Sequence, residues 1–275
     1  MNDYDADAFD TYEQAGWESI AGRFAERWSP ITSLAVDALL DAAHVGQGSR
    51  VLDVGTGAGG AAAHAVRRGA EATGVDVATA MVEIAARRHP EATFVQAPAT
   101  ELPFADGFFD AVVANNVIQH IGEPGQAVCE LKRILAPGGR IALSSWDAAE
   151  RSPFFAAVLG AVASAEVPAP HEAPAGPSFF QFTDDVVFRA LLEDAGFEAV
   201  AVDTIAVEIP VASANELITS LADGTVRVGA ALRVADDMQR DRMRESLEER
   251  LAEWRRGSGF AVPAPMKLAS GTKPA

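Results

Sequence analysis

The sequence predicts an α/β fold built around a doubly wound, mostly parallel sheet. Over residues 50–146, short β-branched runs alternate with helical patterns, and this alternation is typical of βαβ units with right-handed crossovers. The first run leads through a glycine-rich turn into an alanine-rich helix over residues 51–60. Such a turn brings backbone N–H groups and a helix N-terminus close to a small cofactor.

Two amphipathic helical segments precede the first predicted strand and make up residues 1–45. Apolar side chains recur at helical spacing over 8–28, Ser29 and Pro30 interrupt the pattern, and a second segment follows over 31–42. These helices either cover the opening of a binding site or pad the sheet, and the pattern is compatible with both.

Residues 46–147 carry the alternating pattern itself. Their apolar runs predict strands at 50–54, 71–76, 92–97, 110–115 and 139–146. The intervening helices are predicted at 59–68, 78–88 and 123–136, with a short helix at 117–121. A clean helix stop and turn is predicted at Pro137, Gly138 and Gly139.

Residues 148–212 begin with a connection that is rich in proline. We expect it to be poor in helix and to form a mobile crossover near the site, with prolines at Pro168, Pro170, Pro174 and Pro177. A capped helix is predicted to begin at Thr183, Asp184 and Asp185. It ends at Ala195 and Gly196 and leads into a strand over 197–209.

Residues 213–256 predict an all-helical insertion. Its last helical pattern places charged residues on one face and an apolar stripe on the other, made of Met243, Leu247, Leu251 and Trp254. An apolar stripe of this kind has to pack against another part of the molecule. The last region, residues 257–275, contains a further strand pattern over 260–273.

Two aspartates at the ends of the first two predicted strands bear on the choice of cofactor. Gly55, Gly57 and Gly60 satisfy the Gly-x-Gly-x-x-Gly spacing of dinucleotide sites, so a nicotinamide-dependent oxidoreductase has to be considered. A carboxylate at Asp53 would repel a pyrophosphate, whereas it suits a ligand with an ammonium and a sulfonium, such as S-adenosylmethionine. Asp76 is placed to accept hydrogen bonds from ribose hydroxyls of either cofactor, or it is a turn residue.

Four motifs follow one another in a characteristic order. They are Asp53-x-Gly55-x-Gly57-x-Gly59, then Asp76, then residues 102–113, and then Leu131-x-Arg133-x-Leu135-x-Pro137-Gly138-Gly139. In this order they resemble the class I S-adenosylmethionine-dependent methyltransferases, above all the UbiE-like, type 11 small-molecule branch. The resemblance implies a Rossmann-like, seven-stranded, mostly parallel sheet with helical lid insertions in a single domain. It also implies a last strand that runs antiparallel between its neighbours.

The resemblance assigns cofactor contacts to residues at the strand ends. It implies that S-adenosylmethionine binds at Asp53, Gly55, Thr56, Gly57, Asp76, Pro98, Ala99 and Asn115. Pro98 departs from the family pattern, because many relatives have Asp or Asn here to hydrogen-bond the adenine amino group. Proline offers neither a side-chain acceptor nor a backbone N–H, so the N–H of Ala99 is left to serve the adenine ring.

Polar residues after the fourth predicted strand are candidates for contact with the methyl acceptor. Asn116, Gln119 and His120 are expected to point toward it, and His120 is the candidate general base. The alternative for His120 is a role in capping a helix or shaping the pocket. Trp146 is a candidate aromatic wall for an apolar or aromatic acceptor, or it packs beneath the crossover. In similar methyltransferases an insertion like residues 213–256 folds over the acceptor pocket.

Composition narrows the range of partners. The 275 residues are 49% hydrophobic with a net charge of −17, which provides a core but argues against nucleic acid or an anionic membrane as partner. No apolar run reaches the roughly 20 residues that span a membrane, and no secretory signal is apparent. Cys129, expected as a small core residue, is the only cysteine, so we expect a cytoplasmic protein. No cluster has metal-ligand spacing, and we expect no metal.

The sequence thus predicts methyl transfer from S-adenosylmethionine to O, C or N of a small-molecule acceptor. One alternative, which Pro98 keeps open, is a methyltransferase fold repurposed as a binding module or as a non-methylating enzyme such as a cyclase. The nicotinamide oxidoreductase is disfavoured further because Tyr4 and Tyr12 are the only tyrosines and neither belongs to a Tyr-x-x-x-Lys pair. The acceptor is not identified by the sequence, and a homodimer through the tryptophan-bearing lids is left open.

Overall fold

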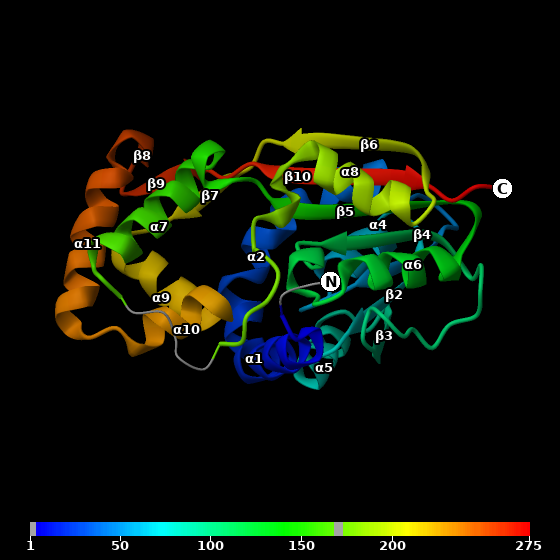
Figure 1. The fold of residues 1–275 in the computed structure, drawn as a ribbon, viewed down its shortest axis with the longest axis horizontal. Coiled ribbons are helices and arrows are strands. Elements are labelled where there is room, and N and C mark those ends of the chain that lie inside the picture. Colours follow the sequence, from blue (N-terminus) through cyan, green and yellow to red (C-terminus); the bar gives the residue numbers. More distant parts are fainter. Residues whose placement is uncertain (1–3, 168–172) are drawn as a thin grey trace.

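The computed structural model describes residues 4–167 and 173–275, and its centre is a seven-stranded sheet (Figure 1). The strand order is β3-β2-β1-β4-β5-β10-β6. The strands are β1 (Arg50–Val54), β2 (Glu71–Asp76), β3 (Thr93–Gln96), β4 (Phe109–Asn115), β5 (Leu135–Trp146), β6 (Glu198–Ile205) and β10 (Met266–Thr272). Only β10 runs antiparallel to its neighbours, β5 and β6. The predicted doubly wound sheet and its inserted last strand are therefore confirmed.

Strand pleating sends alternate residues to two helical layers, as a doubly wound sheet requires. Leu52 and Val112 face one core cluster with α6 (Pro124–Ile134) and α8 (Asp185–Asp194). Val51 and Val113 face another, with α3 (Val36–Ala42) and α4 (Gly60–Arg67). The remaining helix of the parallel half is α5 (Thr79–Arg88), which packs on β2 and β3. Asp184 caps α8 by accepting from the backbone N–H groups of Val186 and Val187, as predicted.

Pairing brings the carboxyl ends of three strands to one place. Val54 of β1 lies opposite Val75 of β2 on one side and Ala114 of β4 on the other. The glycine-rich loop, Asp76 and Asn115 follow directly from these positions. Ligands of open α/β sheets bind beyond this edge, so the register itself defines where a site is built.

The connection after β5 differs from the prediction. A turn at Ala149–Arg151 leads into a 12-residue helix, α7 (Pro153–Ser164), where a helix-poor segment was expected. Ser152 caps this helix, and Pro153 occupies its first turn, where the missing N–H costs nothing. Pro168 and Pro170 lie outside the described residues. The apolar run before these prolines forms the helix, and the prolines lie beyond its end.

Three other boundaries also differ from those predicted. The strand expected over 197–209 is two strands, because the chain leaves the large sheet after β6 and forms β7 (Glu208–Val211) in a second sheet. That sheet has the order β7-β9-β8, with β8 (Arg255–Arg256) and β9 (Gly259–Pro263). The pattern over 260–273 is likewise divided between β9 and β10. The turn at Pro137–Gly139 is an irregularity within β5, where the pairing to β4 shifts register.

The helices before β1 and the helical insertion both contribute residues to the carboxyl edge of the sheet. The N-terminal ones are α1 (Ala6–Arg27), α2 (Ser29–Thr32) and a turn at Ser33–Ala35. The predicted helical insertion is confirmed as α9 (Ala214–Gly224), α10 (Arg227–Val234), α11 (Asp237–Arg250) and a turn at Ala252–Trp254. Two further turns lie at Ile118–His120 and Gln181–Thr183. Helix α1 packs against both α5 and α9, so it bridges the sheet and the insertion.

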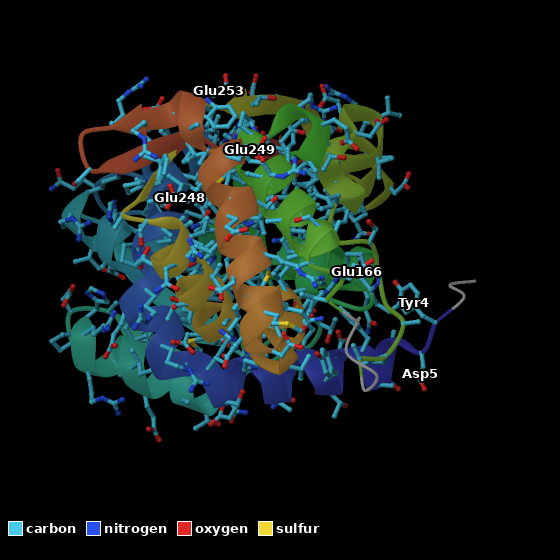
Figure 2. All side chains as sticks on the ribbon, turned by 90° about the vertical axis from the view of Figure 1, so that its left-hand side faces the viewer. Tyr4, Asp5, Glu166, Glu248, Glu249 and Glu253 are labelled. Atoms are coloured by element: carbon cyan, nitrogen blue, oxygen red, sulfur yellow. The ribbon has the colours of Figure 1, made fainter. Side chains whose placement is uncertain are left out.

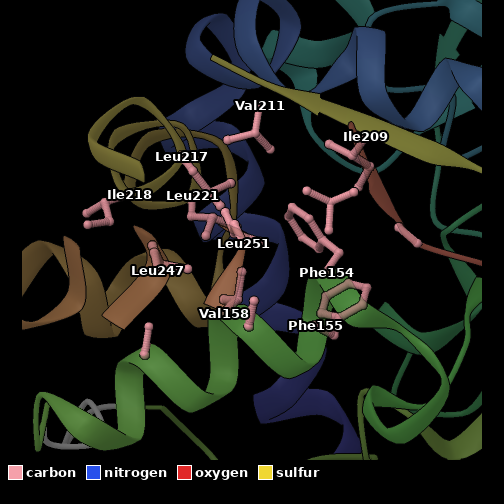
Figure 3. Packing of buried hydrophobic residues seen from close by; sticks show 14 of the residues in the cluster. Phe154, Phe155, Val158, Ile209, Val211, Leu217, Ile218, Leu221, Leu247 and Leu251 are labelled. Atoms are coloured by element: carbon pink, nitrogen blue, oxygen red, sulfur yellow. The ribbon is translucent and has the colours of Figure 1, made fainter. Parts of the chain in front are cut away.

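The insertion, α7 and the second sheet share one hydrophobic cluster (Figure 3). Met243, Leu247 and Leu251 are buried in it, as the apolar stripe predicts, while Trp254 is half-buried. The acidic side chains Glu248, Glu249 and Glu253 lie at the outer side of this part of the molecule (Figure 2). Within the described residues, no helix is long and apolar enough to cross a membrane.

Candidate active site

A cavity of about 340 Å³ lies beyond the carboxyl ends of β1, β2 and β4. The glycine-rich loop and the strand-end residues line one part of it. Aromatic side chains from the N-terminal helices and the crossover line another part, namely Trp17, Phe24, Trp28, Phe155, Phe179 and Phe180. The beginning of α10 also contributes, through Arg227 and Val228. One cavity therefore joins the sequence-predicted cofactor residues to an apolar compartment under the helices.

Asp53 is almost fully buried at the end of β1, with 2% of its surface exposed. One carboxylate oxygen accepts from the Thr56 hydroxyl at 2.7 Å and from the Ala62 N–H at 3.0 Å. These bonds fasten the glycine loop to the strand and to the first turn of α4. Burial raises the pKa of Asp53 to about 7, although both hydrogen bonds favour the charged form. A cationic ligand in the cavity would stabilise the carboxylate.

Asp76 at the end of β2 secures the other side of the same loop. Its two oxygens accept from the N–H groups of Gly57 at 2.9 Å and Ala78 at 3.0 Å. Burial raises its pKa to about 6. Each carboxylate oxygen can accept more than one hydrogen bond, so the backbone contacts leave acceptor capacity for ligand hydroxyls. The alternative role of Asp76 as a turn residue is realised by these backbone contacts, and its contact with a ribose stays a prediction.

The loop between these carboxylates is shaped for close approach of another group. Gly55 has φ +59°, and a Cβ there would lie 2.4 Å from the Val117 side chain. Gly57 has φ +53°, and a Cβ there would lie 3.1 Å from the Phe24 ring. Both positions therefore require glycine. Thr56, between them, is buried and lines the cavity together with the two glycines.

The residues after β3 and β4 complete the predicted cofactor side. Pro98 and Ala99 line the cavity. The Asn115 amide is held by its neighbours, donating to the Thr32 carbonyl at 2.9 Å and accepting from the Ser144 hydroxyl at 2.7 Å. It therefore ties β4 to β5 and to α2.

Asn116 is the strained residue of this site. Its φ is +58°, which is uncommon outside glycine, and its buried Oδ1 has no hydrogen-bond partner within the structure. Its backbone N–H donates to Ser144. Strain and an unpaired buried acceptor together are typical of functional sites, which agrees with the predicted place of Asn116 at the cavity.

Gln119 does not line the cavity, contrary to the expectation of substrate contact. It is fully buried, and its amide donates to the Asn116 carbonyl at 3.0 Å. The short turn at Ile118–His120 rotates it away from His120, because adjacent residues of a helical turn point in different directions. Trp146 lines the cavity and packs edge-on against Phe155, with 5.2 Å between the ring centroids. Its packing beneath the crossover is confirmed, and its contact with an acceptor stays a prediction.

His120 lines the cavity and contacts a buried carboxylate that the sequence analysis overlooked. Its Nδ1 lies 2.9 Å from Oε2 of Glu13 in α1, and its ring packs edge-on against Trp17 and Phe179. Glu13 also accepts from Arg227 Nε at 2.7 Å. A detectable signal existed, because Glu13 falls on the apolar stripe of its helix, one turn after Phe9. A carboxylate at such a position needs partners.

Two further findings concern the single cysteine and the arrangement of side chains that could bind a metal. Cys129 is exposed on α6 rather than in the core, because it falls on the outer side of a helix whose Val128 and Leu131 are buried. Among residues 4–167 and 173–275, no group of three or more His, Cys, Asp or Glu side chains is arranged to hold a metal ion.

Comparison with known proteins identifies the family. A methyltransferase-domain family model matches residues 52–143, the segment that holds the cofactor motifs. The demethylmenaquinone methyltransferase of Beutenbergia cavernae is 28% identical over 204 residues, covering 70% of this chain and 85% of its own length. The chain belongs to the class I S-adenosylmethionine-dependent methyltransferases. The family match ends within β5, so it does not extend to the lids of this methyltransferase.

Further similarities to this methyltransferase are more partial. The demethylmenaquinone methyltransferase of Renibacterium salmoninarum is 33% identical over 116 residues, which is 42% of this chain and 49% of that relative. A phosphoethanolamine N-methyltransferase of Haemonchus contortus, solved with S-adenosylhomocysteine, superposes with a TM-score of 0.57 at 18% identity. The match covers 97% of this chain and 60% of that one, and it shows the shared fold.

S-adenosylmethionine is the cofactor of this methyltransferase, and the residues present fit it. Two buried carboxylates flank a loop that carries no side chains at Gly55 and Gly57. Carboxylates suit the ribose hydroxyls and the positive charges of this nucleoside, and the bare loop allows its close approach.

Proposed function

We propose that this methyltransferase methylates an apolar or aromatic small molecule and that His120 accepts the proton which the acceptor loses. The observation that carries the proposal is the contrast within one cavity. Loop backbone and carboxylates line one part, whereas aromatic rings surround a histidine–glutamate pair in the other. Apolar walls favour an apolar acceptor, and the few polar groups among them set its orientation.

The cofactor side of the proposal uses the residues at the strand ends. Asp76 would accept from the ribose hydroxyls, Asp53 would face the positively charged part, and the N–H of Ala99 would serve the adenine ring. Gly55, Thr56, Gly57 and Asn115 would complete the contacts around the loop, and Pro98 would border the adenine. The support for these roles is the position of all eight residues on one cavity.

The acceptor side uses the aromatic walls. Trp17, Phe155 and Phe179 would pack against the flat or apolar body of the acceptor, with Trp146 and Asn116 nearby. Packed aromatic walls exclude water, and they position the acceptor for in-line transfer. Helices α1 and α10 both contribute side chains to this compartment.

When bound, S-adenosylmethionine would supply a methyl group on a positively charged sulfur, and that sulfur would keep the electron pair of the S–C bond that breaks. Where the acceptor atom is a hydroxyl oxygen, His120 would take up the hydroxyl proton as the oxygen bonds to the methyl carbon. The resulting imidazolium lies beside the Glu13 carboxylate, 2.9 Å from Nδ1. Proximity and orientation supply most of the acceleration in such a transfer, and the base adds to it.

The wider expectations remain parts of the proposal. The net charge of −17 argues against nucleic acid as substrate, and the single free thiol suits a reducing cytoplasm. The homodimer has little support from the tryptophans of the N-terminal lid, because Trp17 packs on His120 and Trp28 is buried within the chain. Trp254 of the insertion is half-buried. Size-exclusion chromatography with light scattering would decide the oligomeric state.

Two experiments test the proposed function. Mass spectrometry of small molecules released by denaturing the purified protein should find S-adenosylmethionine or S-adenosylhomocysteine, and a nicotinamide would overturn the proposal. With labelled S-adenosylmethionine, the protein should then methylate a naphthol, a dihydroxynaphthalene or reduced demethylmenaquinone, since demethylmenaquinone is the compound in the relatives' names. Methylation of phosphoethanolamine alone would contradict an apolar acceptor.

A further inference from the structure

We propose that Glu13 is a positioning residue, which holds His120 in the tautomer that can accept a proton from the acceptor. The inference rests on the proposed function, because it supposes that His120 is the base. It adds a residue from α1, more than one hundred positions away in the sequence, that no motif of the family match includes.

The contact between Glu13 and His120 selects one tautomer. Glu13 Oε2 and His120 Nδ1 are 2.9 Å apart, and the carboxylate is 2% exposed. A carboxylate can only accept a hydrogen bond, so the proton of the neutral ring resides on Nδ1. The basic lone pair is then on Nε2, the nitrogen that Glu13 does not occupy. In other enzymes, too, one nitrogen of a catalytic histidine donates a hydrogen bond to a carboxylate while the other nitrogen accepts a proton from the reacting group.

Glu13 remains charged despite its burial. Burial by itself would raise its pKa, but the neighbouring His120 and Arg227 hold the pKa below its ordinary value. Trp17 Nε1 donates to Oε2 at 3.0 Å and Arg227 Nε donates to Oε1 at 2.7 Å. The other carboxylate of α1 at this cavity, Asp10, accepts from the Gly122 N–H instead. Glu13 is thus the acid that faces His120.

Arg227 connects this pair to the helical lid. Besides Glu13, its guanidinium donates to the carbonyls of Gln119 at 2.9 Å and Pro177 at 3.0 Å, and it lies over the Phe9 ring. One side chain of α10 therefore holds α1, the turn that carries His120, and the crossover. Ring contacts of His120 with Trp17 and Phe179 do not distinguish its two nitrogens, so the orientation of the ring depends on Glu13.

A spectroscopic test reads the tautomer without any turnover. Nitrogen NMR of protein labelled at histidine, in alkaline buffer where imidazoles are neutral, should show His120 protonated at Nδ1. Glu13→Gln should shift the ring to a mixture of tautomers, because a glutamine amide both donates and accepts. Glu26→Gln, which changes an exposed acid on the same helix, is the matched control. A ring protonated at Nε2 in the wild type, or one unchanged in Glu13→Gln, would overturn the proposal.

Kinetics separate positioning from a merely structural role. With a naphthol as acceptor, Glu13→Gln should lower kcat roughly 10- to 1000-fold and leave KM for S-adenosylmethionine nearly unchanged. In a His120→Ala background the same substitution should have no further effect on kcat, since the two residues act as a unit. Equal losses in both backgrounds would show that Glu13 acts only through folding. Thermal melting and calorimetric titration with S-adenosylmethionine establish that each variant is folded.

The two proposals fail in different ways. If His120→Ala has little effect on kcat while the NMR tautomer responds to Glu13, the assignment of the base is wrong and the positioning contact stands. If His120→Ala lowers kcat strongly but the tautomer is unchanged in Glu13→Gln, His120 is still the base and the positioning role of Glu13 is wrong.

Discussion

At the scale of single residues, the two strand-end aspartates serve the loop and the cavity together. Asp53 and Asp76 each accept hydrogen bonds from the glycine-rich segment, and both line the space where the cofactor is expected. Their burial is costly unless the charge is compensated. This cost is consistent with a site whose charge balance is completed by its ligand.

Asp76→Ala should weaken S-adenosylmethionine binding by roughly 1.5–3 kcal/mol, as expected for a lost hydrogen bond to a charged group. Calorimetric titration measures the change. Glu71→Ala, at the exposed start of the same strand, is the control and should bind normally. An unchanged affinity in the Asp76 variant would mean that Asp76 only holds the loop through its backbone hydrogen bonds.

Pro98→Asp should preserve or tighten S-adenosylmethionine binding, because it restores a side-chain acceptor where relatives have one. Pro98→Ala separates loss of the ring from gain of the carboxylate. A marked loss of affinity in the folded Asp variant would show that the pocket is built around the proline. The predicted alignment of the strand end at Pro98 and Ala99 would then be wrong.

His120→Ala should lower turnover roughly 10²- to 10⁴-fold while cofactor affinity stays nearly constant, since the residue would touch the acceptor rather than the nucleoside. Steady-state kinetics and calorimetry measure the two quantities. His64→Ala, on α4 and paired with Asp37, is the control. A decrease in turnover of only a few-fold would mean that His120 lines the pocket without acting as the base.

At the scale of elements, the packing of α11 against α7 gives the helical lid its hydrophobic core. Helix α11 packs against α7 and α9, and its buried face joins the cluster that also holds the second sheet (Figure 3). Leu221 of α9 belongs to this cluster and lines the cavity as well. Packing in the lid thus supports one apolar wall of the cavity.

Leu247→Ala should destabilise the protein by about 2–4 kcal/mol, because it removes a fully packed side chain from this cluster and leaves a cavity. Met238→Ala on the same helix is the control, since Met238 is 66% exposed and should change stability little. Urea denaturation gives both values. Equal, small effects would mean that α11 is not anchored through its apolar stripe.

At the scale of the whole molecule, stability should respond to pH through Asp53. Its pKa is about 7 in the folded protein against an ordinary value of 3.8, so between these values the folded state binds more protons than the unfolded state. The contribution of Asp53 to the free energy of unfolding is present below pH about 4 and is lost as pH rises through about 7. Asp76 acts in the same direction.

The difference in unfolding free energy between wild type and Asp53→Asn isolates this effect, because other titrating groups cancel. It should fall as pH rises from about 4 to about 7, measured by urea denaturation at several pH values. Saturation with S-adenosylmethionine should reduce the slope, since a cationic ligand favours the carboxylate. A difference that is flat with pH would contradict a raised pKa of the buried Asp53.

The sequence alone determined the parallel core, the glycine-rich loop and the family, because these depend on local signals. Short stretches of the sequence are enough to predict the alternating strands and helices, the glycines at positive φ and the carboxylates at strand ends. The same local reasoning misplaced what depends on distant packing. It did not find α7, it joined β6 to β7, and it pointed Gln119 into the cavity.

Only the tertiary structure decided how the apolar part of the cavity is assembled. Glu13, His120 and Arg227 come from the N-terminal helix, the turn after β4 and the lid, and no spacing in the chain relates them. A buried carboxylate on an apolar stripe shows that a partner is needed, but it does not say which. The partner is chosen by the folding of three separate segments onto one edge of the sheet, since a buried charge is stable only where opposite charges and hydrogen-bond donors meet it.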